Sequence, residues 1–369
     1  MNSKIKELTS SIQKINPSKN INIMEVCGTH TMAISRSGIR QLLPPNINLI
    51  SGPGCPVCVT SINDIDCILE IINNYDVSVF TFGDMIRVPG SNSSLYMEKS
   101  KGKDISICYS PTDALEFAKN NPEKKVIFIA IGFETTIPLI SVTVKRAYNE
   151  NINNFYIYNT HKLIPPALNS LLSDKKVKIN GLLCPGHVSV IIGSKPYEFI
   201  PKKYNVPCVI SGFEPIDILM SIETILKQIK DSSTGVQIQY KRVVKKEGNP
   251  IAVSKIYDVF KKIDSRWRGL GNIPESGLKL KPKYLKFDAK IKFPTGETNS
   301  KEPPGCECGN VLKGIKKPQE CKLFAKACTP GSPIGPCMVS SEGTCAAYYK
   351  YERFNLNRIN IENKNINTR

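Results

Sequence analysis

The sequence predicts an α/β fold in which two α/β domains with parallel sheets flank a cleft, followed by a smaller Cys-rich C-terminal domain. The first observation is that β-branched runs alternate with amphipathic stretches over most of the chain, as in βα units. The second is that six cysteines fall within residues 306–345. At 369 residues the chain exceeds one domain of about 100–200 residues.

The strands and helices alternate in order. A capping Thr60 or Ser61 predicts a helix through Ile72, and Ser110 followed by Pro111 predicts another to about residue 119. We expect strands at 21–26, 77–82, 104–109, 125–133, 154–160, 181–184 and 207–213, and further helices at 215–230 and 250–263. The predicted domains are 1–120, 121–235 and 236–369, the last ending in a polar tail.

Charge and hydropathy argue against a nucleic-acid-binding protein and against a membrane protein. The net charge is +18, with 15 Lys and Arg against 5 Asp and Glu in residues 241–292. Because aromatics are not interleaved with these cations, a solvated basic face or a surface for an acidic partner is favoured over nucleic-acid binding. The apolar stretch 126–140 contains Glu134 and falls short of the ~20 residues of a membrane span. No signal peptide is visible, so we expect a cytoplasmic protein without membrane insertion.

Thirteen cysteines in a reducing compartment indicate metal or redox chemistry rather than structural disulfides. Six of them lie near the C-terminus, where paired C-x2-C knuckles typical of zinc are absent. The irregular spacing therefore favours an iron-sulfur cluster. One consistent partition takes Cys306, Cys321, Cys328 and Cys345 as cluster ligands and leaves Cys308 and Cys337 as a nearby pair. Spacing alone does not decide this partition.

A second group of cysteines follows predicted strands. Cys27 comes directly after a strand, and Cys55 and Cys58 form a C-x2-C just before a helix. A helix N-terminus lowers a thiol's pKa, so these three cysteines could together hold a transient iron ion, with His30 as a proton or nitrogen donor. Thioredoxin-like disulfide chemistry at Cys55 and Cys58 competes with this interpretation.

Polar loops follow several other strands. Carboxyl ends of parallel strands share one edge of a sheet, where open α/β sheets bind ligands. We therefore expect these loops to line the cleft. Their polar residues are Asp84, Arg87, Glu134, Thr135, Thr136, His187, Glu214 and Asp217. The remaining cysteines, Cys67, Cys108, Cys184 and Cys208, lie in apolar runs and are expected to be core residues.

These segments together resemble the HypD family of hydrogenase formation proteins. The matching strings are MEVCGTHT, GPGCPVCVT, TFGDMIRVPG, IGFETT, PGHVSVIIG, GFEPIDIL, WRGLG, CECG and GPCMVSSEGTCAAYYKY. The resemblance spans residues 22–352.

The resemblance implies a maturation scaffold rather than a conventional turnover enzyme. Such proteins have two α/β domains around a cleft and a third domain with a 4Fe-4S cluster. With a HypC-type chaperone they hold a transient Fe(II) that receives two CN ligands and one CO. A HypE-type partner delivers the cyanide, which comes from carbamoyl phosphate made usable by HypF.

Carried onto this chain, the resemblance implies three sets of residues. Cys27, Cys55 and Cys58 would be associated with the iron, beside His30. Cys308 and Cys337 would form a redox pair that passes electrons from the cluster to the cleft. The cluster ligands would be Cys306, Cys321, Cys328 and Cys345.

Two other functions fit parts of the sequence. An iron-sulfur thiol-disulfide oxidoreductase acting on small proteins would share the cluster and the C-x2-C but would not need Cys27. A zinc-dependent nucleic-acid binder would use the positive charge.

Overall fold

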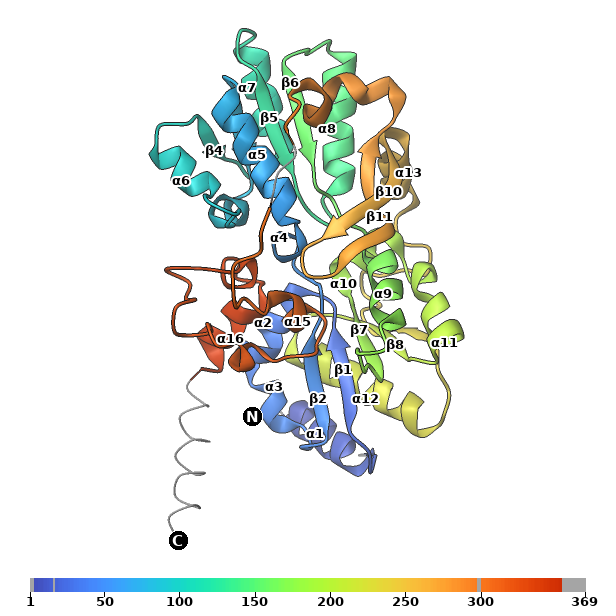
Figure 1. Cartoon of the computed structure of the whole chain (residues 1–369). Helices are drawn as coiled ribbons and strands as arrows, with labels where there is room; N and C mark the ends of the chain where they lie inside the picture. Colours follow the sequence, from blue (N-terminus) through green and yellow to red (C-terminus); the bar gives the residue numbers. More distant parts are fainter. Residues whose placement is uncertain (1–2, 16, 297–299, 354–369) are drawn as a thin grey trace.

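The chain forms an α/β structure with two parallel sheets, as the alternating pattern predicts (Figure 1). The computed structural model describes residues 3–15, 17–296 and 300–353. The five-stranded sheet has the order β2-β1-β7-β8-β9, with bounds Ile47–Ser51, Ile21–Glu25, Gly181–Pro185, Cys208–Ser211 and Val236–Ile238. The four-stranded sheet has the order β4-β3-β5-β6, with bounds Ile105–Ile107, Ser78–Thr81, Val126–Ala130 and Phe155–Asn159.

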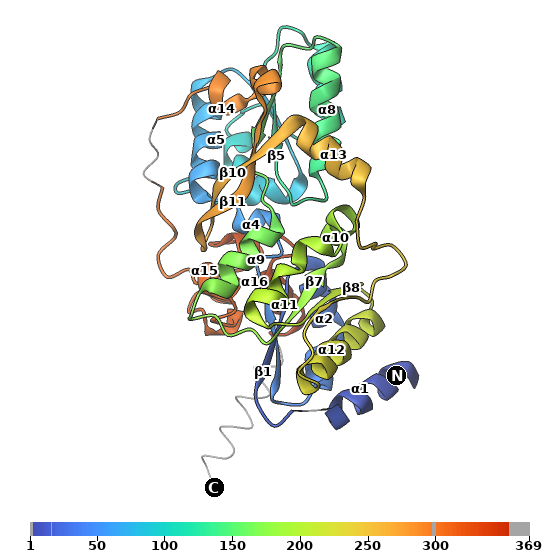
Figure 2. The same cartoon turned by 90° about the vertical axis from the view of Figure 1, so that its right-hand side faces the viewer.

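Each sheet contains strands from both sides of residue 120, the predicted boundary between the first two domains. Strands β1 and β2 pair first, the chain then builds the four-stranded sheet, and β7 returns to pair with β1. Figures 1 and 2 show the five-stranded sheet in the lower half of the molecule and the four-stranded sheet in the upper half. The chain therefore crosses between the sheets twice, which the linear order of the strands does not reveal.

Most predicted helices form with the predicted caps. Ser61 accepts a hydrogen bond from the Asp64 amide at 3.1 Å, and Ser110 caps the helix that begins at Pro111. The longer helices are α1 Ser3–Ile15, α2 Gly28–Ser37, α5 Ile62–Asn74, α7 Pro111–Asn120, α8 Ile137–Asn149, α9 Ile164–Ser173, α12 Pro215–Lys230, α13 Pro250–Val259 and α16 Thr344–Tyr351. Shorter ones are α3 Ile39–Leu42, α4 Pro56–Val59, η1 Gly83–Arg87, α6 Leu95–Ser100, α10 Gly186–Ile192, η2 Lys195–Tyr197, α11 Phe199–Tyr204, η3 Pro282–Phe287 and α14 Ala289–Lys292.

The helix expected at 250–263 was predicted too long. It ends at Val259, and the chain continues as an antiparallel hairpin of β10 Phe260–Trp267 and β11 Gly271–Leu280. This hairpin spans the junction between the two sheets (Figure 2). The buried Trp267 anchors it there, since its ring stacks on that of Phe133 with centroids 6.1 Å apart and its backbone forms a β-bridge with Thr60.

The Cys-rich segment contains little regular structure, as expected. It comprises α15 Cys308–Leu312, η4 Pro318–Glu320, η5 Pro336–Met338 and α16. Its buried side chains, among them Leu312, Met338 and Tyr348, belong to the same apolar core as Met24 of β1 and Ile129 of β5. The segment is therefore held by the sheets rather than by a core of its own. The predicted polar tail, 355–369, lies outside the described residues.

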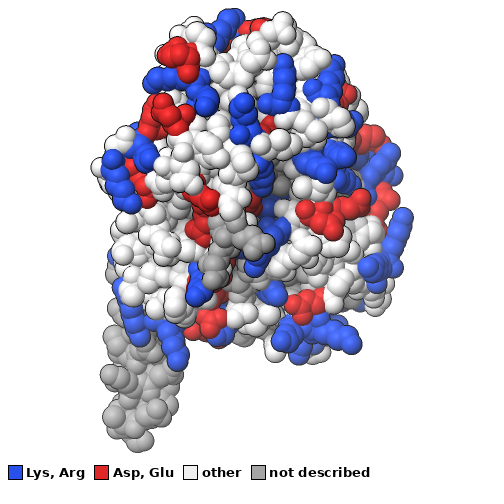
Figure 3. Space-filling view, turned by 45° about the horizontal axis from the view of Figure 1, so that its top comes forward, with Lys and Arg blue, Asp and Glu red and all other residues white. Residues whose placement is uncertain are grey.

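Positive and negative side chains are interspersed on the face of the molecule drawn in Figure 3. In Figure 3, Lys and Arg side chains lie among Asp, Glu and uncharged residues on the face shown. Within the described residues, no helix is both long enough and apolar enough to cross a bilayer.

A buried carboxyl lies in the loop after β5. Glu134 is 3% exposed, and its Oε1 accepts a hydrogen bond from the Ile164 amide at 3.0 Å. Its Oε2 is buried and has no hydrogen-bond partner among the described residues. Burial raises the pKa of Glu134 from 4.5 to about 7, against the opposing effects of the amide hydrogen bonds and of Lys262. The folded protein therefore holds a proton on Glu134 that the unfolded chain releases at lower pH.

This shift predicts a pH dependence of stability. Since the folded-state pKa is the higher one, the stabilisation is complete below pH 4.5 and is lost as the pH rises to about 7. The loss should reach about 3 kcal/mol. Chemical denaturation across this range should show the free energy of unfolding of the wild type falling relative to Glu134→Gln, which has no titrating proton. A constant difference between the two proteins would contradict the assignment.

Candidate functional site

The CGTH and GPGCPVC motifs meet at the carboxyl edge of the five-stranded sheet. Strands β1 and β2 are paired in parallel, so the loops after them emerge side by side. The Gly28 amide donates to Gly54 O at 3.0 Å. A Cβ on Gly54 would lie 2.4 to 2.7 Å from backbone atoms of Cys27, so only glycine permits this approach. The structure thus brings Cys27 next to the C-x2-C loop.

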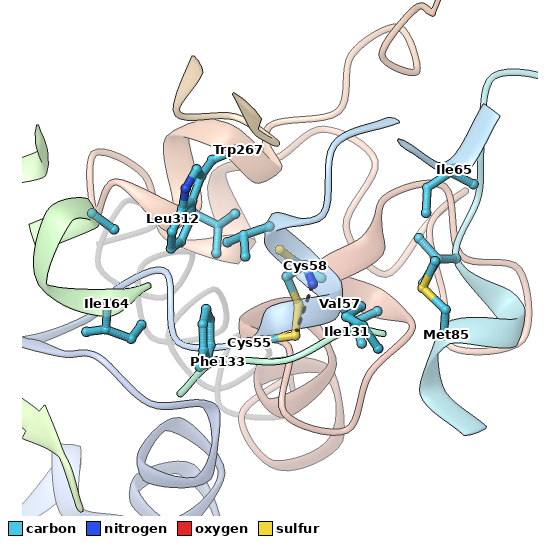
Figure 4. Close-up of a cluster of buried hydrophobic side chains, with 14 of the residues drawn as sticks. Cys55, Val57, Cys58, Ile65, Met85, Ile131, Phe133, Ile164, Trp267 and Leu312 are labelled. Atoms are coloured by element: carbon cyan, nitrogen blue, oxygen red, sulfur yellow. Dashed lines mark hydrogen bonds between the residues drawn. A yellow bond between two sulfur atoms is a disulfide. The ribbon is translucent and has the colours of Figure 1, made fainter. Parts of the chain in front are cut away.

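Cys55 and Cys58 are joined by a disulfide. Cys55 is the N-cap of α4, and its Sγ accepts a hydrogen bond from the Cys58 amide at 3.2 Å. Figure 4 shows the pair surrounded by apolar side chains, including Val57 and Ile131. Both cysteines are buried. In this oxidised form neither sulfur is a thiolate, and metal ligation requires a two-electron reduction.

Cys27 caps α2 and is buried beside an acidic side chain. Burial raises the pKa of its thiol to about 11, and the negative charge of Glu342 adds to this effect. The amides of His30 and Thr29 act in the opposite direction. Glu342 is held in place because Thr29 Oγ1 donates to its Oε1 at 2.7 Å. A bound cation would offset the cost of a thiolate in this setting.

His30 lies within the first turn of α2 and is fully buried. Its Nε2 is 3.0 Å from Gly212 O, so this nitrogen carries the proton. Its Nδ1 has no partner among the described residues. Burial lowers the pKa of His30 to about 4, which keeps the ring neutral and Nδ1 an available acceptor or ligand nitrogen.

The loop after β8 carries Phe213, which contacts His187, one of the residues predicted to line the cleft. Phe213 packs against His30 with ring centroids 4.7 Å apart, and His187 stacks on Phe213 at 4.0 Å. Asp217 is held by a salt bridge with Arg242, so it supports the loop rather than facing a ligand. His187 and His30 therefore both pack against one aromatic ring.

Two of the other predicted loop residues, Asp84 and Arg87, contact the Cys-rich segment, whereas Thr136 contacts a neighbouring loop of its own sheet. Ser340 Oγ donates to Asp84 Oδ2 at 2.6 Å, and Arg87 donates to Pro330 O. Thr136 Oγ1 lies 3.2 Å from His161 Nε2 in the loops after β5 and β6. Of the polar loop residues, Asp84 and Arg87 thus tie the four-stranded sheet to the Cys-rich segment.

The C-terminal cysteines surround a small enclosed cavity. Cys337 is fully buried but is not part of its lining. A Cβ on Gly335 would lie 2.5 Å from Cys308 Sγ and 2.6 Å from Cys306 Sγ, so glycine leaves room for both sulfurs. The cysteines in the lining are Cys306, Cys308, Cys321, Cys328 and Cys345.

These thiols affect one another's pKa. Cys308 is at the centre, since hydrogen-bonding effects of Cys306, Cys337 and Cys345 all act on its pKa. The hydrogen bond with Cys308 lowers the pKa of Cys306 to about 7, despite burial. The pKa of Cys308 is raised by its bonds to Cys306 and Cys337 and by burial. The bond with Cys308 lowers the pKa of Cys337, but burial and the nearby thiols raise it above its ordinary value.

The two cysteine groups are in contact through η5. Helix α4 packs against η5, and Cys58 Sγ lies 3.8 Å from Pro336 O. Pro336 directly precedes Cys337, whose thiol is close enough to Cys308 to affect its pKa. A continuous path of contacts therefore leads from the Cys55–Cys58 disulfide to the cysteine-lined cavity.

No assembled metal site is present in the described part of the chain, where no three His, Cys, Asp or Glu side chains form a set that could hold a metal ion. The donors nevertheless fit an iron-sulfur cluster by their chemistry, since five thiols face one small cavity whose lining also includes Leu323, Phe324 and Met338.

Sequence reasoning missed Glu342 and Phe213. Glu342 lies three residues before Cys345, and only the docking of α16 on α2 brings it to Cys27. The signal available was the acidic residue within the SEGTC string.

The comparisons with known proteins agree with these motifs. A family model for HypD, described as "Hydrogenase formation hypA family", matches residues 3–352. Hydrogenase maturation factor HypD2 of Bradyrhizobium diazoefficiens is 44% identical over 92% of this chain and 91% of its own length. Hydrogenase maturation factor HypD of Escherichia coli is 45% identical over 90% of each chain. A putative hydrogenase expression/formation protein of Methanocaldococcus jannaschii is 45% identical over 95% of this chain and 96% of its own. The chain belongs to the HypD family of hydrogenase maturation factors.

Proposed function

We propose that the protein is a redox-active scaffold in nickel-iron hydrogenase maturation. Together with a HypC-type chaperone and a HypE-type cyanide donor, it binds an iron ion and assembles the Fe(CN)2CO group in the cytoplasm. The observation that carries the proposal is the contact between the Cys27 and C-x2-C loops and the Cys-rich segment. The iron is cargo, taken up and passed on.

The cargo site would consist of Cys27 with the reduced forms of Cys55 and Cys58. Thiolates suit iron carrying strong-field ligands, and the neutral His30 supplies an acceptor nitrogen. Their burial excludes water from the bound iron. The negative charge of Glu342, adjacent to Cys27, would favour a cation at this site.

The resident cofactor would be a 4Fe-4S cluster held by Cys306, Cys321, Cys328 and Cys345. When bound, it supplies single electrons at negative potential. Five cysteines line the cavity, and a cubane needs four. We assign Cys308 the other role because it is close enough to Cys337 for each to affect the other's pKa, and Cys337 lies outside the lining.

The thiol pair would reduce the disulfide by exchange. The Cys337 thiol attacks one sulfur of the Cys55–Cys58 bond, forming a mixed disulfide and passing its proton to the sulfur that leaves. The Cys308 thiol then attacks Cys337, passing its proton to the second leaving sulfur, which leaves a Cys308–Cys337 disulfide and the Cys55 and Cys58 thiols. Two electrons have moved to the cargo site, and two further electrons restore the pair. Cysteines on neighbouring, packed elements suit such a relay.

The ligand partition can be tested by iron and sulfide analysis. Because Cys321 lines the cavity as an assigned ligand, Cys321→Ala should lose most of the about four irons and four sulfides of a cubane cluster. Cys308→Ala should retain them, as should Cys67→Ala, which changes a cysteine of α5. Loss of the cluster in Cys308→Ala but not in Cys321→Ala would reverse the assignment.

The cargo is tested by infrared spectroscopy. The protein, purified anaerobically with its co-expressed HypC-type partner, should show metal-bound CN and CO bands between the amide and C–H regions. Cys27→Ala should abolish the bands, whereas the control Cys108→Ala, a buried cysteine after β4, should keep them. Bands that persist in Cys27→Ala would refute Cys27 as a ligand.

The disulfide favours a second candidate, an iron-sulfur thiol-disulfide oxidoreductase acting on small proteins. The same experiment separates the two. An intact iron-sulfur chromophore without CN or CO bands in the wild-type complex would support the oxidoreductase.

A further inference from the structure

A second candidate site lies away from all three cysteine groups. A cavity of about 750 Å³ is enclosed by α9, α11, α13 and the β10–β11 hairpin, and Glu134 is part of its lining. Its size falls within the range of about 300–1,000 Å³ found for small-molecule sites. None of the thirteen cysteines lines it, so the proposed iron chemistry does not account for it.

The walls are apolar and rigid. Side chains from several elements, such as Leu163, Phe199 and Ile273, supply an apolar surface. Prolines hold the backbone around them with few conformations to lose on binding. The prolines in the lining are Pro165, Pro166, Pro196 and Pro274. The cavity is thus suited to enclose an apolar molecular body.

One polar group in the lining is buried and has an oxygen that lacks a partner within the described part of the chain. Glu134 is buried, and its Oε2 lacks a partner among the described residues, which leaves a polar atom that costs roughly 1–3 kcal/mol when unpaired. A hydroxyl, amide or carbonyl of a ligand would remove this cost. Such a buried, unsatisfied atom in the lining of a cavity is an independent sign of a missing ligand.

Exposed lysines lie at the solvent side of the lining. Lys203 Nζ donates to Asn169 Oδ1 at 3.2 Å, while Lys262 Nζ forms no hydrogen bond or ion pair with the described residues. Glu275 is the only exposed acid in the lining, so cations outnumber anions there. Lys262 also acts on the titration of Glu134, which places the two within electrostatic range.

We propose that this cavity binds a small organic anion, whose apolar body fills the proline-lined space and whose anionic group lies beside Lys262 and Lys203. A neutral polar group of the ligand pairs with Glu134. The proposal is independent of the iron scaffold and would stand if that function failed.

The test uses two fluorescent probes that differ by one sulfonate, 8-anilino-1-naphthalenesulfonate and its uncharged parent N-phenyl-1-naphthylamine. With the full-length, cluster-loaded protein, the anionic probe should bind saturably at one site and about tenfold tighter than the neutral one. Lys262→Glu should remove this preference. Lys261→Glu, the neighbouring exposed lysine of β10, should leave it intact.

A second pair of variants tests the location. Val253 of α13 lines the cavity, so Val253→Trp should fill it and weaken both probes at least about tenfold. The exposed Ser254 does not line it, and Ser254→Trp should bind as the wild type does. Thermal unfolding checks that each variant is folded.

Three results would overturn the proposal. The anionic probe could fail to bind, or Val253→Trp could bind it unchanged, which would place the dye elsewhere. Equal binding of both probes, unaffected by Lys262→Glu, would show an apolar cavity without anion recognition.

Discussion

Arg40 forms the interaction on which the arrangement of the cysteines depends. From α3 it donates to Glu25 of β1 and to Glu352 at the end of α16, and its guanidinium lies 4.7 Å from the centre of the Tyr348 ring. Glu25 is fully buried, and burial raises its pKa to about 7 against the charge of Arg40 and a hydrogen bond from Ser51, so the cation offsets part of the cost of burying this group. By binding Glu25 and Glu352 at the same time, Arg40 fixes the Cys-rich segment to the five-stranded sheet. The position of Cys345 in α16 is fixed with it.

That attachment has consequences for the chemistry of the thiols. Because the Cys-rich segment shares the core of the sheets, four of its cysteines are buried, as are both cysteines of the C-x2-C loop. Burial raises the pKa of Cys27 and disfavours free thiolates. Metal binding or disulfide formation relieves this cost. The disulfide at Cys55 and Cys58 is one such outcome, and iron ligation would be the other.

The sequence predicted those features that depend on local pattern. Strand positions followed from β-branched runs, and caps such as Ser61 followed from their own turns. The hairpin was missed because β10, FKKIDSRW, is largely exposed and shows little apolar alternation. The chain crossing between the sheets, and the contact of Glu342 with Thr29, depend on long-range packing. No single segment encodes them.

The central claim is that the Cys308 and Cys337 pair connects the cluster to the cargo site. Anaerobic reduction by dithionite, followed by alkylation of free thiols and peptide mass spectrometry, measures this connection at Cys55 and Cys58. The account predicts that the disulfide opens in the wild type and at least about tenfold more slowly in Cys337→Ser, although the cluster absorbance bleaches equally in both. Equal rates of disulfide opening in the two proteins would contradict the account.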